Sequence, residues 1–98
     1  MSEYETKNSH VYIMKPVHAN VYKIGETVSL ENRIAKLQKK FSFKLEYVGF
    51  SVLMEDGFSA EDFLHRKYER FHLGGDWFAL DENALNEILQ MFKTWESK

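Results

Sequence analysis

A group of basic side chains is concentrated between residues 32 and 45 of this sequence. The group comprises Arg33, Lys36, Lys39, Lys40 and Lys44, and no acidic residue lies among them. Arg33, Lys36 and Lys40 follow helical spacing. Guanidinium and ammonium groups in such an array suit contacts to phosphate oxygens, which accept hydrogen bonds and carry negative charge. A run of this kind is equally typical of a solvated helix face. The pattern therefore predicts either a phosphate-contacting surface or an ordinary exposed one.

A second pair of side chains with useful chemistry stands later in the chain. Glu61 and His65 are four residues apart, and on a helix such residues lie on the same face. An imidazole titrates near neutral pH, so His65 is a candidate acid–base group. Two simpler interpretations stay open: a surface pair, or an acid placed in a first helical turn because the helix dipole favours it there.

Cysteine chemistry is excluded, because the chain contains no cysteine. Disulfides, thiolate zinc sites and a cysteine nucleophile are ruled out, and the spacing of the four histidines does not form a zinc pattern. No apolar run approaches the roughly 18 residues that cross a bilayer, and the first nine residues are polar. We therefore expect a cytoplasmic protein with no membrane segment.

The composition is that of one ordinary globular domain. Of 98 residues, 44% are hydrophobic and 29% charged, and eight Phe, five Tyr and two Trp supply a core. We expect a flexible N-terminus over residues 1–9 and a single domain over 10–98. The formal net charge of −2 argues mildly against a strongly electrostatic nucleic-acid binder.

The basic residues need a helix and two strands to position them. Runs rich in β-formers predict strands over 10–14 and 21–25, joined by a loop that holds the only proline. Ser29 is a candidate N-cap for the helix that follows. The apolar stripe of that helix would be formed by Leu30, Ile34, Leu37 and Phe41.

Glu61 and His65 belong to the next predicted helix. A third strand is expected over 44–53, and Ser59 with Asp62 matches a capping box, with Phe58 and Phe63 as its hydrophobic staple. The buried face of this helix would consist of Ala60, Leu64, Tyr68 and Phe71.

The last third of the chain begins where two glycines break that helix. Residues 76–80 form a short apolar segment, either extended or an irregular plug, in which Trp77 and Phe78 suit core packing or stacking on nucleobases. Asp81 would cap a final helix whose stripe is Leu85, Ile88, Leu89 and Phe92. The order β-β-α-β-α-α predicts an α/β (α+β) fold, with a small three-stranded antiparallel sheet and flanking helices.

Four short stretches, in order, resemble motifs of the GIY-YIG nuclease superfamily. Residues 10–12 stand at its first motif and keep Tyr12, while residues 23–25 stand at its second and keep the isoleucine and the glycine. Arg33 matches its helix arginine, and Glu61 matches its metal-binding glutamate. From about His10 to Leu89 the chain is most similar to the phage-related T5orf172 branch, often described as a DNA-binding domain. That narrower likeness rests on residues 22–27, Arg33 with Leu37, residues 61–65, and Gly75–Phe78.

The resemblance implies a metal-dependent endonuclease acting on DNA phosphodiesters. Glu61 would hold one divalent metal, Mg²⁺ or Mn²⁺, as a Lewis acid on the phosphate. Arg33 would clamp a phosphate oxygen, and Tyr12 would act as the general base or orient the attacking water. Lys23 occupies the position of the second-motif tyrosine, where it would bind phosphate rather than relay a proton. Leu37 stands where many active members place a histidine or tyrosine, so His65 is the candidate replacement acid–base group.

Those departures keep two other functions open. One is a non-cleaving DNA-binding module on the same fold, and the other is a phage or mobile-element accessory protein that acts through protein contacts. In a chain of 98 residues we expect no separate sequence-reading domain. Specificity would therefore come from a homodimer, a protein partner or the structure of the DNA.

Overall fold

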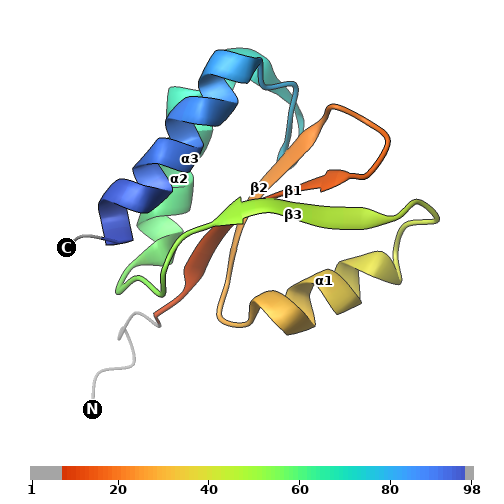
Figure 1. Ribbon diagram of the computed structural model, residues 1–98, viewed down its shortest axis with the longest axis horizontal. Helices are drawn as coiled ribbons and strands as arrows, with labels where there is room; N and C mark the ends of the chain where they lie inside the picture. Colours follow the sequence, from red (N-terminus) through yellow and green to blue (C-terminus); the bar gives the residue numbers. More distant parts are fainter. Residues whose placement is uncertain (1–7, 97–98) are drawn as a thin grey trace.

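The chain builds one antiparallel sheet with helices on both of its faces. The computed structural model describes residues 8–96, so residues 1–7 and 97–98 lie outside the described part. The elements, in chain order, are β1 (His10–Pro16), β2 (Tyr22–Thr27), α1 (Leu30–Gln38), β3 (Leu45–Phe50), α2 (Gly57–Lys67), a 3-10 turn (Glu69–Phe71), β4 (His72–Gly74), β5 (Trp77–Phe78) and α3 (Glu82–Glu96). Figure 1 shows their arrangement.

The sheet has five strands in the order β3-β1-β2-β5-β4, all antiparallel. The predicted α+β class is confirmed, but the predicted strand count of three is wrong. The segment left as extended or irregular supplies β5, which pairs with β2 through Tyr22↔Phe78 and Lys23↔Trp77. Strands of two and three residues carry almost no alternation of their own, so only their pairing partners reveal them.

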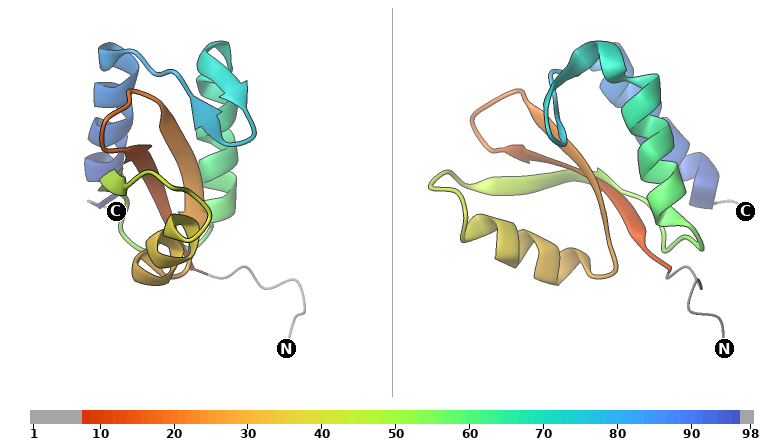
Figure 2. Two further views of the ribbon diagram at one scale, coloured as in Figure 1. Left: turned by 90° about the vertical axis from the view of Figure 1, so that its right-hand side faces the viewer. Right: turned by 180° about the vertical axis from the view of Figure 1, so that it is seen from behind.

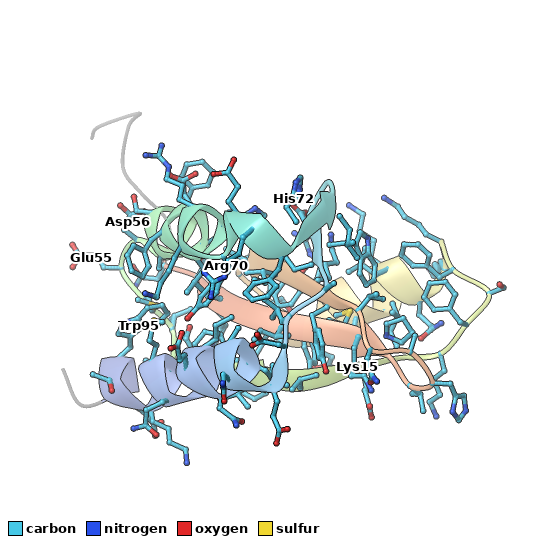
Figure 3. All side chains as sticks on the ribbon, turned by 90° about the horizontal axis from the view of Figure 1, so that it is seen from above. Lys15, Glu55, Asp56, Arg70, His72 and Trp95 are labelled. Carbon is cyan, nitrogen blue, oxygen red and sulfur yellow. The ribbon has the colours of Figure 1, made fainter. Side chains whose placement is uncertain are left out.

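Alternate residues of β1 build two separate cores, because successive side chains of a strand point to opposite faces. Val11 and Ile13 are fully buried in the larger core, which the strands form with α2 and α3. Tyr12 and Met14 are fully buried in the smaller one, under α1. Figure 2 shows the strands lying between α1 and the pair of helices. In the view from above, α2 and α3 follow opposite margins of their face, with side chains filling the space between them (Figure 3).

The helix starts follow from their caps. Ser29 accepts a hydrogen bond from the Asn32 amide, which confirms the predicted N-cap of α1. Asp81 accepts one from the Ala84 amide at the start of α3, as expected. The predicted start of α2 is wrong by three residues, because Asp56 and not Ser59 accepts the bond. Aspartate caps as well as serine does, and the chain offered both.

Several predicted boundaries were too long. α1 ends at Gln38, so Phe41 packs on the small core from beyond the helix. β3 ends at Phe50 rather than at residue 53. The predicted staple is also wrong, because Phe58 and Phe63 are both largely exposed.

At the start of the domain, Ser9 pairs with Met54 in both directions and is buried. Most of the segment predicted to be flexible, residues 1–9, lies outside the described part. No helix within residues 8–96 is long and apolar enough to cross a membrane.

Candidate metal centre

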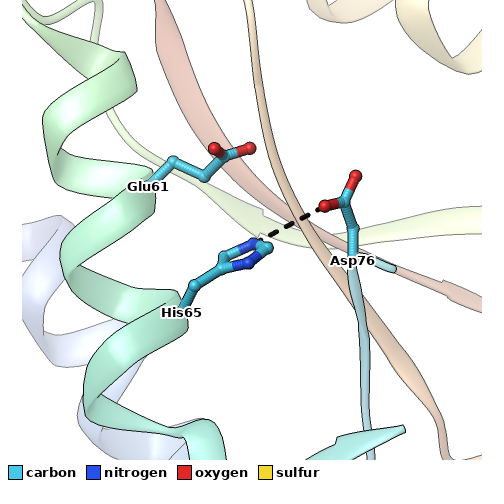
Figure 4. A group of neighbouring side chains, drawn as sticks. All are labelled: Glu61, His65 and Asp76. Carbon is cyan, nitrogen blue, oxygen red and sulfur yellow. Dashed lines mark ion pairs between the residues drawn. The ribbon is translucent and has the colours of Figure 1, made fainter. Parts of the chain in front are cut away.

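Three side chains that can bind a metal converge beside β2. Glu61 and His65 come from adjacent turns of α2, and Asp76 comes from the turn between β4 and β5 (Figure 4). One ligand atom from each lies within 4.8 Å of the other two, and all three residues are half-buried. Within residues 8–96 this is the only such group of His, Asp and Glu side chains.

The main chain of β2 fixes the positions of two of these residues. The Ile24 amide donates to the Asp76 carbonyl at 3.0 Å, and the Ile24 carbonyl accepts from His65 Nε2 at 2.8 Å. A carbonyl oxygen only accepts, so Nε2 carries the hydrogen and Nδ1 is the nitrogen left to accept a proton. Gly75, at φ +55°, turns the chain so that Asp76 reaches this edge.

Lys23 extends from β2 into the same site. Its Nζ lies 3.0 Å from Asp76 Oδ2, and its side chain is only 13% exposed. The same ammonium lies 5.9 Å from the centre of the Trp77 ring. The cation that replaces the expected tyrosine is therefore held by a carboxylate and an aromatic ring.

Carboxylates crowd this edge of the sheet. Burial raises the pKa of Glu61, and the negative charges of Asp76 and Glu26 raise it further, while His65 and Lys23 lower it. The site therefore holds three mutually repelling carboxylates and two nitrogen groups that offset them in part.

Tyr12 lies on β1, a strand paired with β2, and its side chain points to the α1 face of the sheet. It stands across from Gly25 in the β1–β2 pairing, and a Cβ added at Gly25 would lie only 2.5 Å from the Tyr12 hydroxyl. That hydroxyl is buried and has no hydrogen-bond partner among the described residues. Burial raises the pKa of Tyr12 to about 12, although the charge of Arg33 opposes the shift. The group therefore stays protonated at neutral pH, and its hydrogen has no acceptor among the described residues.

Arg33 belongs to the same surroundings but comes from α1. Its positive charge lowers the pKa of both Tyr12 and Tyr47 against the effect of their burial. The rings of these two tyrosines meet edge to face, with centroids 5.5 Å apart. Within residues 8–96 Arg33 forms no ion pair, which leaves its guanidinium free to bind an anion.

The structure separates the predicted residues into two groups. Tyr12, Lys23, Glu61 and His65 surround one site, and the charge of Arg33 acts on the same tyrosine. The four predicted DNA-contacting lysines are exposed toward the end of α1 and in the loop before β3; they are Lys36, Lys39, Lys40 and Lys44. Leu37, which stands where many active members of the superfamily have a histidine or tyrosine, is buried in the small core.

Two acidic residues of the site were missed from the sequence. Asp76 belongs to the Gly-Asp-Trp-Phe block that carried part of the resemblance, and Glu26 follows the second motif directly. The position of each block along the chain was a usable signal. Nothing in the sequence indicates that these two residues lie close to α2, because that proximity depends on the pairing of β5 with β2.

Comparison with known proteins assigns the chain to a family. The model of the T5orf172 domain matches residues 9–95, nearly the whole sequence. No curated protein and no solved structure matches. Membership suggests a module with a DNA-related role. The chain belongs to the T5orf172 domain family.

Proposed function

We propose that this chain is a metal-dependent endonuclease domain that acts on DNA phosphodiesters and has a GIY-YIG-like fold. The observation that carries the proposal is the convergence of Glu61, His65 and Asp76, two of whose charges also act on the buried hydroxyl of Tyr12. A carboxylate pair, a histidine and a hydroxyl donor are the groups that phosphodiester hydrolysis uses. Arg33 adds a cation with no partner in the described chain.

The chemistry of the donors fits a hard divalent cation. Glu61 and Asp76 offer carboxylate oxygens, which Mg²⁺ and Mn²⁺ prefer, while His65 Nε2 is already bonded to the Ile24 carbonyl. The two carboxylates would thus hold the metal. When bound, such a cation polarises a phosphate oxygen and lowers the pKa of a coordinated water.

The remaining residues have distinct tasks in this proposal. Arg33 binds a non-bridging phosphate oxygen, for which a guanidinium is well shaped. Tyr12 donates its hydrogen, since a pKa of about 12 leaves almost no phenolate to act as a base. His65 is the candidate acid–base group; its Nε2 lies 2.8 Å from the Ile24 carbonyl oxygen and 3.9 Å from Asp76 Oδ1. Tyr12 is therefore not the general base of this proposal, and that role passes to His65.

One observation favours a second function, a DNA-binding module that does not cleave. Lys23 Nζ lies 3.0 Å from Asp76 Oδ2 and neutralises the carboxylate that a metal would use. In that case Lys23 and Arg33 bind phosphate, and no strand is broken. DNA retention would still weaken as salt rises, because phosphate contacts release counterions.

Supercoiled plasmid separates the two functions. The wild type is incubated with Mg²⁺, with Mn²⁺ and with chelator, beside Glu61→Gln. The matched control is Asp62→Asn, which removes a neighbouring carboxylate of α2 whose one ion-pair partner within residues 8–96 is Arg66. The nuclease proposal expects metal-dependent nicking that Glu61→Gln abolishes and Asp62→Asn retains. Salt-sensitive DNA retention without nicking would instead support the binding module.

A further inference from the structure

Hydrogen bonds hold the loop before β3 against the tip of the β1–β2 hairpin. Gln38 holds this loop from both sides: its Nε2 donates to the Phe43 carbonyl at 2.7 Å, and its Oε1 accepts from the Leu45 amide at 2.9 Å. The Val17 amide in turn donates to the Lys44 carbonyl at 2.8 Å. The loop is therefore fixed against the hairpin, at the end of the sheet away from both termini (Figure 1).

These two loops line an open pocket of about 330 Å³, which we call the hairpin-tip cavity. Its lining is almost entirely apolar, with two basic side chains among the residues that form it: Pro16, His18, Ala19, Val21, Phe43 and Lys44. This volume is near the lower end of the roughly 300–1,000 Å³ of ligand pockets. It suits one planar ring system and is too small for a helix or a strand of a partner protein.

An unbroken series of cationic and aromatic contacts joins the candidate metal centre to this cavity. Lys23 binds Asp76 and lies over the Trp77 ring. Trp77 meets Phe41 edge to face at 6.0 Å, and Phe41 stacks on Phe43 at 4.9 Å. The series consists of one ammonium followed by three aromatic rings. Proteins follow a single nucleic-acid strand by combining basic side chains with aromatic rings on which bases stack.

We propose that the hairpin-tip cavity takes an unpaired nucleobase of the DNA strand that occupies the candidate metal centre. Pro16 of the cavity stands four residues along β1 from Tyr12, about 13 Å at the usual rise of a strand. That span covers a strand a few nucleotides long. The inference rests on the proposed action on DNA and names its substrate class: DNA with a single-stranded segment beside the contacted phosphate.

A paired base does not meet the requirements of this cavity. Bases inside a duplex are stacked on one another, and a cavity walled by two loops admits one only after it has left the stack. The chain also has a net charge of −2, which disfavours broad electrostatic binding along a duplex. Stacking on Phe43 with Lys44 beside it instead gives a local, sequence-tolerant contact.

The test is a binding measurement in chelator, where no strand is cut. We would titrate wild-type protein against a blunt duplex and against the same duplex with a single-stranded extension carrying one 2-aminopurine, moved position by position. The expected results are tighter binding of the extended DNA and a fluorescence change confined to one or two positions. Phe43→Ala should weaken that binding roughly 5- to 150-fold, as expected for one stacked base, and Phe43→Tyr should restore it.

Phe58→Ala is the matched control, because Phe58 is 66% exposed but lies on α2, outside the series. Phe43 is already 41% exposed, so we expect each variant to remain folded, and a thermal melt of each checks this. Equal binding of the two DNAs, no binding of either, or equal losses for Phe43→Ala and Phe58→Ala would overturn the proposal. Since the assay needs no cleavage, a protein that fails to nick plasmid can still meet every expectation here.

Discussion

The two faces of the sheet differ in what they bury. Toward α2 and α3 the strands present aliphatic side chains such as Val11 and Ile13, and among the described residues no buried side-chain nitrogen or oxygen is left unpaired on that face. Toward α1 they present Tyr12, whose hydroxyl is buried without a partner. Neighbouring residues of one strand thus serve different ends, since the helix-pair face stabilises the fold and the tyrosine face keeps a donor available.

The largest effect is expected on the helix-pair face. Ile88 of α3 is fully buried in the larger core, so Ile88→Ala should lower the free energy of unfolding by about 2–5 kcal/mol through lost burial and a cavity. Urea denaturation measures the loss. A change under about 1 kcal/mol would mean that α3 is not part of the stabilising face.

Two glycines sharpen the comparison, because each would place a new methyl 2.5 Å from a side-chain atom. At Gly25 the atom is the hydroxyl of Tyr12, whose ring is buried, and at Gly49 it is the terminal Cδ2 of Leu89. A terminal methyl can shift and a buried ring cannot. Gly25→Ala should therefore cost about 1–3 kcal/mol, and Gly49→Ala less. Equal costs from parallel urea titrations would contradict the rigid packing of Tyr12.

Tyr12→Phe should separate stability from activity. Removing a buried hydroxyl without a partner relieves its desolvation, so the free energy of unfolding should rise by about 1 kcal/mol. The nicking rate should fall about a hundred-fold or more, as it does when one transition-state donor is lost. A less stable variant would show that the hydroxyl is bonded in solution, and unchanged nicking would remove it from the mechanism.

The smallest effect is expected at a surface pair. Asp62 and Arg66 form an ion pair of 3.0 Å on α2, with Arg66 81% exposed. Exposed pairs of this spacing contribute about 0.3–0.5 kcal/mol, and Asp62→Asn should lose no more than that and no activity. A large loss of nicking in this variant, in the plasmid assay, would move the site away from Glu61 and toward its neighbour.

Local signals were enough to predict most of the fold. β1, β2 and the Ser29 cap of α1 follow from runs of β-formers and from one hydroxyl at the right position. The stripe of α3 was also correct, because Ile88 and Phe92 are buried in the larger core. The two short strands were missed because they exist only through pairing with β2 and with each other.

Only the part of the candidate site that lies on one helix could be predicted from the sequence. Glu61 and His65 are four residues apart on one helix, and spacing alone places them together. Asp76 reaches them only because the Gly75 turn and the Ile24 backbone bonds bring it there. The ion pair that occupies Lys23 was equally hidden, since its two residues are 53 positions apart.

The central claim is that Glu61 and Asp76 hold a divalent metal. Binding of Mn²⁺, followed by its effect on water proton relaxation, tests this most directly, with wild type, Glu61→Gln and Asp62→Asn compared at equal concentration. Glu61 forms no ion pair within residues 8–96, so its replacement breaks none, and a thermal melt of each variant checks that it is folded. We predict one saturable Mn²⁺ site per chain that Glu61→Gln removes and Asp62→Asn keeps. Absence of saturable binding in the folded wild type, or equal binding by all three proteins, would contradict the account.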